Sequence, residues 1–506
     1  MIVAALLLGL VAFIAVLRIL RAERVARRVA STAQTALRVM SDPDKSDDEK
    51  EREVRRASVT LLGLFLAIAG IGVAALGATA AVVWGGAQAG LYSLDAAIAV
   101  ASSWPFLIGS TVGAVVLWLA LDRLGRGKPA PEAGKADRDT SDRDEVPYGP
   151  MEQALHNFAF ASPARQKRLG ALETRLYRGR IDPARAHRPV FVTSLPRAGT
   201  TIMLNALAGL PEFASATYRH MPFTLSPLLW SRIGPIFQQS ATTAERAHGD
   251  GLEVSGDSPE AFEEMLWMAF FPRHYREDRI LTWDAGELEP EFAEYFRTHM
   301  AKVVATKPGA RRYLSKNNAN IARLPLIEAI CPDAAVLIPV RDPRAHVASL
   351  MRQHARFLDL HAREPFGRRY MEGVGHFEFG AALRPIAFRE GAPGPQAATG
   401  PDFWLRYWID AYEHVLATAG RGAVFLDHDA FCAAPQAHLP QLARAIGAED
   451  PAELAALAPM FRAPRPAPVL DGADPQLLAR ADALHDTLCR RALGAEAAPI
   501  AKEATA

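Results

Sequence analysis

Three long apolar runs lie near the start of the chain, and none of them contains a charged residue. The first is 17 residues long, the other two are 26 residues long each, and they cover Met1–Leu17, Val59–Trp84 and Ala96–Leu121. The hydrocarbon core of a bilayer is about 30 Å thick, and a helix of about 20 apolar residues crosses it. The pattern therefore predicts an all-α transmembrane region over residues 1–121, with about three helices near residues 1–20, 59–84 and 96–121.

Basic residues are unevenly distributed around these runs. Arginines follow the first run and precede the second, and Arg123, Arg126 and Lys128 follow the third. The loop between the second and third runs, Gly85–Asp95, contains neither Lys nor Arg. Because cytoplasmic loops are enriched in Lys and Arg, we expect a multi-pass membrane protein with cytoplasmic residues 18–58 and a cytoplasmic globular part after the third run. The charges follow the first run instead of preceding it, which favours an anchor over a secretory signal.

The rest of the chain is predicted to contain a linker, a globular domain and a tail. Residues 122–150 are rich in Pro, Gly and charged side chains without apolar periodicity, as is typical of a linker. The pattern becomes globular after it, so we place a domain at residues 151–495 and a tail at 496–506. A formal net charge of +1 over 506 residues gives no indication of a nucleic-acid partner. The 3 cysteines are scattered, which indicates neither a disulfide framework nor a clustered metal site.

The segment Pro189–Leu210 has the pattern of a buried strand, a tight turn and a helix. Val190–Val192 is a β-branched and aromatic run, and apolar side chains recur at helical spacing from Thr200 onward. The turn between them contains Gly199, which permits close backbone approach, and Arg197, which carries a permanent charge. Together with the free N–H groups of a helix start, these residues suit a phosphate-like anion, although an ordinary strand-to-helix turn has the same outline. The turn lacks the lysine and the spacing of a Walker loop.

Further strand-and-helix units follow this segment. Their predicted strands are Arg312–Ser315, Ala334–Val340 and Ala423–Leu426. This alternation predicts an α/β fold with a mostly parallel sheet flanked by helices. The aromatic-rich insertion His220–Pro308 separates the first unit from the next, and insertions of this kind commonly build the acceptor pocket in such folds.

Two of the predicted strands end beside a cation. Lys316 follows one of them, in a region of the chain that contains only five lysines, and Arg341 follows the next. Ligands of open sheets collect at the carboxyl ends of the strands, so Lys316 is a candidate for contact with an oxyanion. Ser349 lies about two helical turns beyond Arg341, so these two side chains can hold one phosphate. A solvated lysine, a surface arginine and a helix serine are the alternatives that the pattern leaves open.

Together these segments resemble a known family. SLPRAGTT at 194–201, SKNNANIARLPLIEAICPDA at 315–334 and VLIPVRDPRAHVASL at 336–350 are similar in order and spacing to three signatures of the sulfotransferases that use 3′-phosphoadenosine-5′-phosphosulfate (PAPS). An aromatic helix near Phe403 and the strand before Asp429 resemble later segments of that family, so the similarity covers about residues 188–460. The resemblance implies a P-loop-like fold and a transferase.

The resemblance also implies a role for each matched position. Arg341 and Ser349 would hold the 3′-phosphate of PAPS, and Lys316 would neutralise the sulfuryl group in transfer. The 5′-phosphosulfate would lie in the loop formed by Arg197, Ala198, Gly199, Thr200 and Thr201. PAPS is thus the expected co-substrate, and no metal is expected. The acceptor would be a hydroxyl or amine of a small molecule, a glycan or a lipid, and the bilayer is the other expected partner.

The sequence departs from the family where a catalytic base would stand. Cytosolic members carry a histidine two residues after the lysine, whereas this chain has Asn318 there. Tyrosylprotein members have a glutamate after the loop, and the aligned residue here is Tyr218. We therefore expect the base in the insertion, with His248 ranked slightly first among the candidates His220, His248, Asp257 and Glu260.

Two other functions are compatible with parts of the pattern. A degenerate P-loop phosphotransferase is opposed by the missing Walker lysine and by the lack of a clear carboxylate pattern for Mg²⁺. A nucleotide-binding membrane scaffold without turnover is disfavoured because Arg197, Lys316 and Arg341 occur together.

Overall fold

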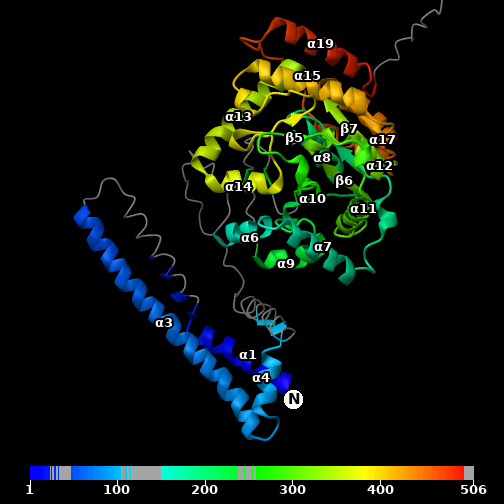
Figure 1. Ribbon diagram of the computed structural model, residues 1–506. Helices are drawn as coiled ribbons and strands as arrows, with labels where there is room; N and C mark the ends of the chain where they lie inside the picture. Colours follow the sequence, from blue (N-terminus) through cyan, green and yellow to red (C-terminus); the bar gives the residue numbers. More distant parts are fainter. Residues whose placement is uncertain are drawn as a thin grey trace, which may run out of the picture. The chain divides into compact units, whose positions relative to one another are not determined.

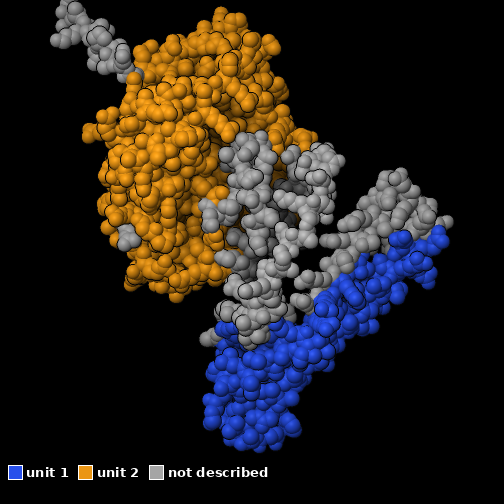
Figure 2. Space-filling view, turned by 180° about the vertical axis from the view of Figure 1, so that it is seen from behind, with its two compact units in different colours: residues 1–138 blue, residues 139–506 orange. Residues whose placement is uncertain are grey.

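The computed structural model describes residues 1–22, 47–103, 150–237 and 258–494, with short pieces at residues 24–25, 28–29, 32, 106, 109–110, 113–114, 244–245 and 253–254. The chain divides into two compact units, Met1–Arg138 and Asp139–Ala506, which Figure 2 colours separately. The predicted linker, apart from Pro150, and the predicted tail lie outside the described residues.

The first unit contains three described helices: α1 (Ile2–Ile19), α3 (Asp47–Gln88) and α4 (Leu94–Ala101). By length and composition, α1 and the Arg55–Gln88 part of α3 can each cross a membrane, with mean hydropathies of 2.8 and 2.5. The third predicted span is described only at its start, where it overlaps α4, and most of its residues after Ser103 lie outside the described part. The predicted count of three spans is therefore not confirmed.

Helix α1 packs against α3 near Gly9. The hydroxyl of Thr79 donates to the Gly9 carbonyl oxygen at 3.2 Å. A Cβ atom built at Gly9 would lie 3.1 Å from the Thr79 methyl, so glycine permits the close approach that apolar helices use to associate. Large apolar side chains stay exposed along α3, a surface suited to lipid, and they include Val59, Leu62, Phe65, Leu66, Val73 and Leu76.

The second unit is built on a five-stranded sheet in which every strand pair is parallel. The strand order is β2-β6-β1-β7-β9, with bounds of Phe213–Ala214, Arg312–Lys316, Val190–Val192, Ala335–Val340 and Ala423–Asp427. The predicted α/β fold class is confirmed. Figure 1 shows the helices on both sides of this sheet, with α15 (Pro401–Thr418) and α19 (Pro475–Cys489) side by side.

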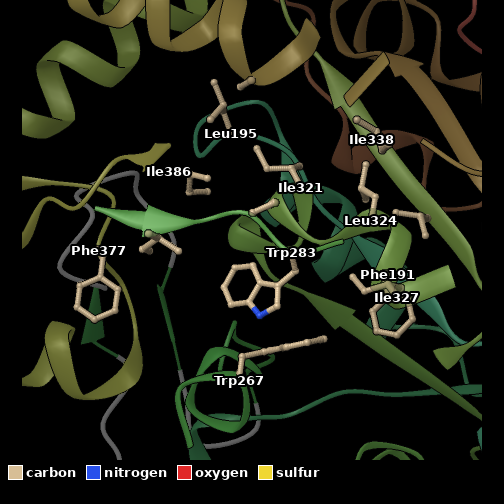
Figure 3. Packing of buried hydrophobic residues seen from close by; sticks show 14 of the residues in the cluster. Phe191, Leu195, Trp267, Trp283, Ile321, Leu324, Ile327, Ile338, Phe377 and Ile386 are labelled. Carbon is tan, nitrogen blue, oxygen red and sulfur yellow. The ribbon is translucent and has the colours of Figure 1, made fainter. Parts of the chain in front are cut away.

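Alternate side chains of the sheet enter two separate core layers, as the period of two along a strand requires. Val190 and Val192 pack in one layer with α8 (Thr200–Ala208) and α17 (Pro435–Ile446). Phe191 enters the other layer, where Figure 3 shows it beside Ile327. Because both layers are apolar, the register of the central strand β1 is fixed from both sides.

The insertion His220–Pro308 contributes mainly to the second of these layers. Trp267 and Trp283 are buried, as Figure 3 shows, and they flank the guanidinium of Arg323 with its Cζ 4.3 and 4.6 Å from the ring centroids. Arg323 also pairs with the Glu264 carboxylate, which accepts from Asn317 Nδ2 at 2.7 Å. This buried network anchors the backbone directly after β6.

Two small sheets complete the strands. The hairpin of β3 (Ala244–Glu245) and β4 (Glu253–Val254) is antiparallel, whereas β5 (Ile280–Leu281) and β8 (Ile386–Ala387) pair in parallel. The α-helices not yet named are α6 (Pro150–Phe160), α7 (Pro163–Leu176), α9 (Pro227–Phe237), α10 (Glu264–Phe270), α11 (Pro290–Val304), α12 (Leu324–Ile330), α13 (Pro343–Arg363), α14 (Pro365–Val374), α16 (His428–Ala433) and α18 (Pro451–Ala455). Short 3₁₀-helices are η1 (Pro183–Ala186), η2 (Tyr218–His220), η3 (Pro272–His274), η4 (Ala285–Glu287), η5 (Asn318–Ala322), η6 (Gly380–Ala382), η7 (Pro395–Ala397) and η8 (Ala458–Met460).

Candidate functional site

The carboxyl ends of the parallel strands converge on one cleft. The loop after β1 contributes Arg197 and Gly199, β6 contributes Lys316, and Arg341 follows β7. The cleft is also lined by His376, Glu378 and Phe379, and by His428 after β9. Residues that are more than 200 positions apart in the sequence thus share one site. The structure brings together the cations that the sequence placed at separate strand ends.

The loop after β1 has the strand, turn and helix that the sequence predicts. Gly199 has a φ of +95°, and a Cβ atom there would lie 2.3 Å from Nδ1 of His428. Only glycine therefore allows the loop to pass this close to the imidazole. Arg197 also has a positive φ, 74°, which is costly for a residue with a side chain and is found at functional sites. Helix α8 begins at Thr200, so its first N–H groups lie at the loop.

Arg197 connects the loop to the helix that follows β7. Its Nε donates to the Ser349 hydroxyl at 3.3 Å, and its carbonyl oxygen accepts from Nη1 of Arg341 at 3.2 Å. The sequence predicts that Ser349 and Arg341 hold one phosphate. In the structure both residues form a hydrogen bond with Arg197. The Nε of Arg341 is buried and has no hydrogen-bond partner among the described residues. A buried guanidinium N–H of this kind is available to an anion.

Lys316 lies at the end of β6 beside a buried carboxylate. Its Nζ is 3.8 Å from Oε1 of Glu260, and both side chains are less than a tenth exposed. Glu260 also accepts from the Tyr218 hydroxyl at 3.0 Å and from the Ala261 N–H at 2.8 Å. Glu260 is not among the described residues that line the cleft. Its position is that of a counter-ion to Lys316.

The other candidate bases occupy different positions. His220 is buried, its Nδ1 accepts from the Thr217 N–H at 3.0 Å, and it is not among the described residues lining the cleft. His248 and Asp257 lie outside the described residues. A catalytic role for any of the four candidates stays a prediction.

Asn318, which stands where cytosolic relatives carry a histidine, links the loop helix to an acidic side chain. Its Oδ1 accepts from the Thr200 hydroxyl at 3.2 Å, and its Nδ2 donates to Oε1 of Glu378 at 3.0 Å. The sequence did not indicate Glu378, His376 or His428 as site residues. His428 had a usable signal, since it lies two residues after a predicted strand. His376 and Glu378 lie in an irregular segment that carries no periodic pattern.

A buried histidine, His346, forms a hydrogen bond with the loop after β1. Trp408 Nε1 donates to Nδ1 of His346 at 3.1 Å, so Nε2 carries the proton and donates to the Pro196 carbonyl oxygen at 2.8 Å. Burial, which penalises the imidazolium, lowers the pKa of His346 to about 3. The neutral ring therefore bridges α15 to the loop over the physiological pH range.

We expect Gly199→Ala to destabilise the protein more than Gly309→Ala. Both glycines have positive φ, which costs about 1–2 kcal/mol for a residue with Cβ. At Gly309 a Cβ would meet nothing within 4 Å, whereas at Gly199 it would overlap His428, which adds about 1–3 kcal/mol. Urea unfolding of the full chain in detergent measures both losses, and equal losses would contradict the close approach to His428.

We expect His346→Gln to flatten the acid side of the stability profile. The folded protein keeps His346 neutral, with a pKa of about 3, while the unfolded chain protonates it near its ordinary value of 6.5. Stability from this group is complete above pH 6.5 and is lost as pH falls towards 3, by up to about 1.4 kcal/mol per pH unit. Urea unfolding at several pH values between 7 and 4 measures the slope of the unfolding free energy against pH, and this slope should be smaller in His346→Gln.

The control is His187→Gln, since the side chain of His187 is 76% exposed. This variant should keep the slope of the unmodified protein. If His346→Gln has that same slope, the assignment of the buried neutral ring is wrong.

Comparisons with known proteins agree with the sequence motifs. Residues 189–377 match the model of the "Sulfotransferase family". No curated protein matches the chain. A crystal structure of the sulfotransferase STF9 from Mycobacterium avium is 16% identical, with a TM-score of 0.39 over 68% of this chain and 87% of that one. For the sulfotransferase STF1 from Mycobacterium tuberculosis the values are 14% and 0.36, over 60% of this chain and 80% of that one. The resemblance that the motifs indicate is confirmed over residues 189–377, which match this family's model.

Proposed function

We propose that this protein is a membrane-anchored sulfotransferase that moves a sulfuryl group from PAPS to a hydroxyl acceptor. The family assignment supports a sulfotransfer reaction. The observation that carries the finer proposal is the cleft in which Arg197, Lys316 and Arg341 meet at the carboxyl ends of neighbouring parallel strands. PAPS carries a 3′-phosphate and a 5′-phosphosulfate on the same ribose. A site for it therefore needs cations at two separate points of one cleft.

The loop after β1 suits the phosphosulfate end of this donor. Gly199 leaves the space that a Cβ would fill, and the N–H groups at the start of α8 supply donors for anionic oxygens. Arg197 adds a charged donor, and its Nε is held by Ser349. The sulfuryl group would therefore lie between this loop and Lys316.

Arg341 suits the 3′-phosphate. Its Nη1 is used by the Arg197 carbonyl oxygen, whereas its buried Nε has no partner among the described residues. The Ser349 hydroxyl accepts from Arg197 and so keeps its own proton for a second anion contact. The two side chains thus offer donors beside the loop, as the sequence resemblance implies.

The chemistry that these residues support is positioning with charge stabilisation. In sulfuryl transfer the acceptor oxygen bonds to sulfur while the bond from sulfur to the 5′-phosphate oxygen breaks. Negative charge grows on the leaving phosphate, and Lys316 and Arg197 lie where they can stabilise it. Removing one preorganised donor of this kind typically costs about 10²–10³ in rate. Glu260, with Oε1 3.8 Å from Nζ of Lys316, is the counter-ion of this lysine.

Membrane anchoring is proposed from α1 and α3. Their apolar composition and the exposed apolar side chains of α3 support a bilayer as their surroundings. The arginine-rich flanks support a cytoplasmic catalytic domain, where cytosolic PAPS would be accessible.

We expect Arg341→Ala to weaken binding of adenosine 3′,5′-bisphosphate by about 10–100-fold, because a charge-assisted hydrogen bond contributes about 1.5–3 kcal/mol. Binding of adenosine 5′-monophosphate, which lacks the 3′-phosphate, should fall much less, because it loses only the support that Arg341 gives to the loop at the Arg197 carbonyl oxygen. Titration calorimetry on both nucleotides measures the difference. Arg352→Ala, at an exposed position of α13, is the matched control and should leave both affinities unchanged.

Equal losses for the two nucleotides would remove Arg341 from the 3′-phosphate. The unmodified protein should also bind adenosine 3′,5′-bisphosphate more tightly than ATP. The reverse order would favour the phosphotransferase alternative over the sulfotransferase.

We expect reporter fusions placed after Lys128 to be active only with a reporter that works in the cytoplasm. The reason is the enrichment of basic residues on one side of the apolar segments. The companion fusion within Gly85–Asp95 should give the opposite result. Activity after Lys128 of a reporter that requires export would refute the cytoplasmic orientation.

A further inference from the structure

An apolar pocket adjoins the anion cleft. Its walls are largely aromatic and aliphatic and include Leu195, Phe377, Leu383, Ile386, Trp404 and Tyr407. Figure 3 shows Leu195, Phe377 and Ile386 in this part of the core. Pro196, Asn318 and Glu378 line both the pocket and the cleft, so the two spaces meet at these residues.

The pocket has a defined frame. Strand β8 pairs with β5, with Ile386 opposite Ile280, and the Ile386 N–H donates to the Tyr407 hydroxyl at 3.2 Å. The Gly380 N–H donates to Nδ1 of His354 on α13 at 3.1 Å. The segment from Gly375 to Ile386 is therefore tied to three other elements, and it presents its side chains from a fixed backbone.

Glu378 stands at the junction with one carboxylate oxygen held. The Asn318 amide is oriented by the Thr200 hydroxyl on its Oδ1, which turns Nδ2 towards Oε1 of Glu378. Among the described residues, no donor is bonded to Oε2 of Glu378. An ionised carboxylate oxygen that lacks a donor can accept a proton.

The other acidic and imidazole groups near the cleft are less well placed for an acceptor in this pocket. Glu260 is occupied by Tyr218, Ala261 and Lys316. His376 lines the cleft but not the pocket, and its Nε2 is bonded to the Ala261 carbonyl oxygen at 3.0 Å. Glu378 is the acidic side chain that touches both spaces among the described residues.

We propose that the apolar pocket receives the acceptor and that Glu378 is its general base. The inference rests on the proposed sulfuryl transfer. The proton of the acceptor O–H passes to Glu378, the acceptor oxygen bonds to sulfur, and the bond from sulfur to the 5′-phosphate oxygen breaks, releasing adenosine 3′,5′-bisphosphate. Asn318, which cannot take this proton itself, is the positioning residue that holds Glu378.

The lining selects the class of acceptor. Polar groups of Asn317, Arg384 and Tyr407 also line the pocket. A sugar ring placed among Leu383, Trp404 and Ile386 would nevertheless hold most of its hydroxyls against carbon, which is unfavourable. A phenol or another apolar alcohol buries its carbon skeleton and leaves its one hydroxyl at the junction. The acceptor of this site is therefore an apolar alcohol or phenol.

Glu378→Gln tests the base, because glutamine keeps an oxygen for Asn318 but cannot take a proton. Single-turnover transfer from labelled PAPS to naphthol, which is un-ionised near neutral pH, should fall by about 10²–10⁴. Transfer to para-nitrophenol, assayed at a pH where it is largely ionised, should fall far less, because it needs no base. Glu372→Gln is the matched control, since this carboxylate lies on α14 and pairs with Arg368 at the surface, and it should leave both rates unchanged.

Affinity for adenosine 3′,5′-bisphosphate should be the same in all three proteins. Equal rate losses for the two phenols would assign Glu378 a purely structural role. Normal transfer to naphthol by Glu378→Gln would likewise overturn the proposal, and loss in His376→Ala alone would move the base to His376.

Leu383→Trp tests the pocket, since the larger side chain fills it. It should raise KM for naphthol by about tenfold without changing the affinity for adenosine 3′,5′-bisphosphate, whereas the volume-conserving Leu383→Met should change little. If the unmodified protein does not bind that nucleotide, the proposed function itself fails. If it binds the nucleotide but transfers label to maltose, or to neither phenol, only the acceptor inference is overturned.

Discussion

The parallel pairing of five strands is the constraint on which the site depends. Parallel strands end at the same edge, so the loop after β1, Lys316, Arg341 and His428 must be neighbours whatever their separation in the sequence. The pairing is secured by two apolar layers, because β1 sends Phe191 to one layer and its flanking valines to the other. A slip of β1 by one residue would exchange these layers and move Arg197 relative to Lys316 and Arg341.

The loop after β1 has an unfavourable backbone conformation, which contacts with neighbouring residues stabilise. Arg197 and Gly199 both have positive φ, which an isolated turn of this sequence would not favour. Three hydrogen bonds hold the loop. Neutral His346 donates to the Pro196 carbonyl oxygen, and Arg341 donates to the Arg197 carbonyl oxygen. The Ser349 hydroxyl accepts from Nε of Arg197. Arg341 directly follows β7, and His346 and Ser349 lie on α13, so the segment that follows one strand maintains the strained loop of the neighbouring strand.

The sequence was sufficient for the features that arise from regular pattern. The strand, turn and helix at Pro189–Leu210, the parallel sheet and the cations at strand ends all follow from periodicity and position, and the structure has them. It was insufficient for features that depend on tertiary contacts between irregular segments. Glu378 lies in an irregular segment that is held partly by the pairing of β8 with β5, and neither strand is longer than two residues, too short to leave a period in the sequence. The insertion had suggested an acceptor pocket, yet much of its aromatic content fills the core around Arg323.

Two carboxylates near the cleft have different environments, and the difference explains why an asparagine can stand in place of the family's histidine. Glu260 lies beside Lys316, and its oxygens accept from the Tyr218 hydroxyl and the Ala261 N–H, so both of its oxygens already have partners. Glu378 has one oxygen bonded to a neutral amide, which fixes its direction without neutralising it. In the proposed mechanism Asn318 orients Glu378, and Glu378 takes the proton that the family's histidine would take. Glu378 lines both the apolar pocket and the cleft, whereas Lys316 lines only the cleft.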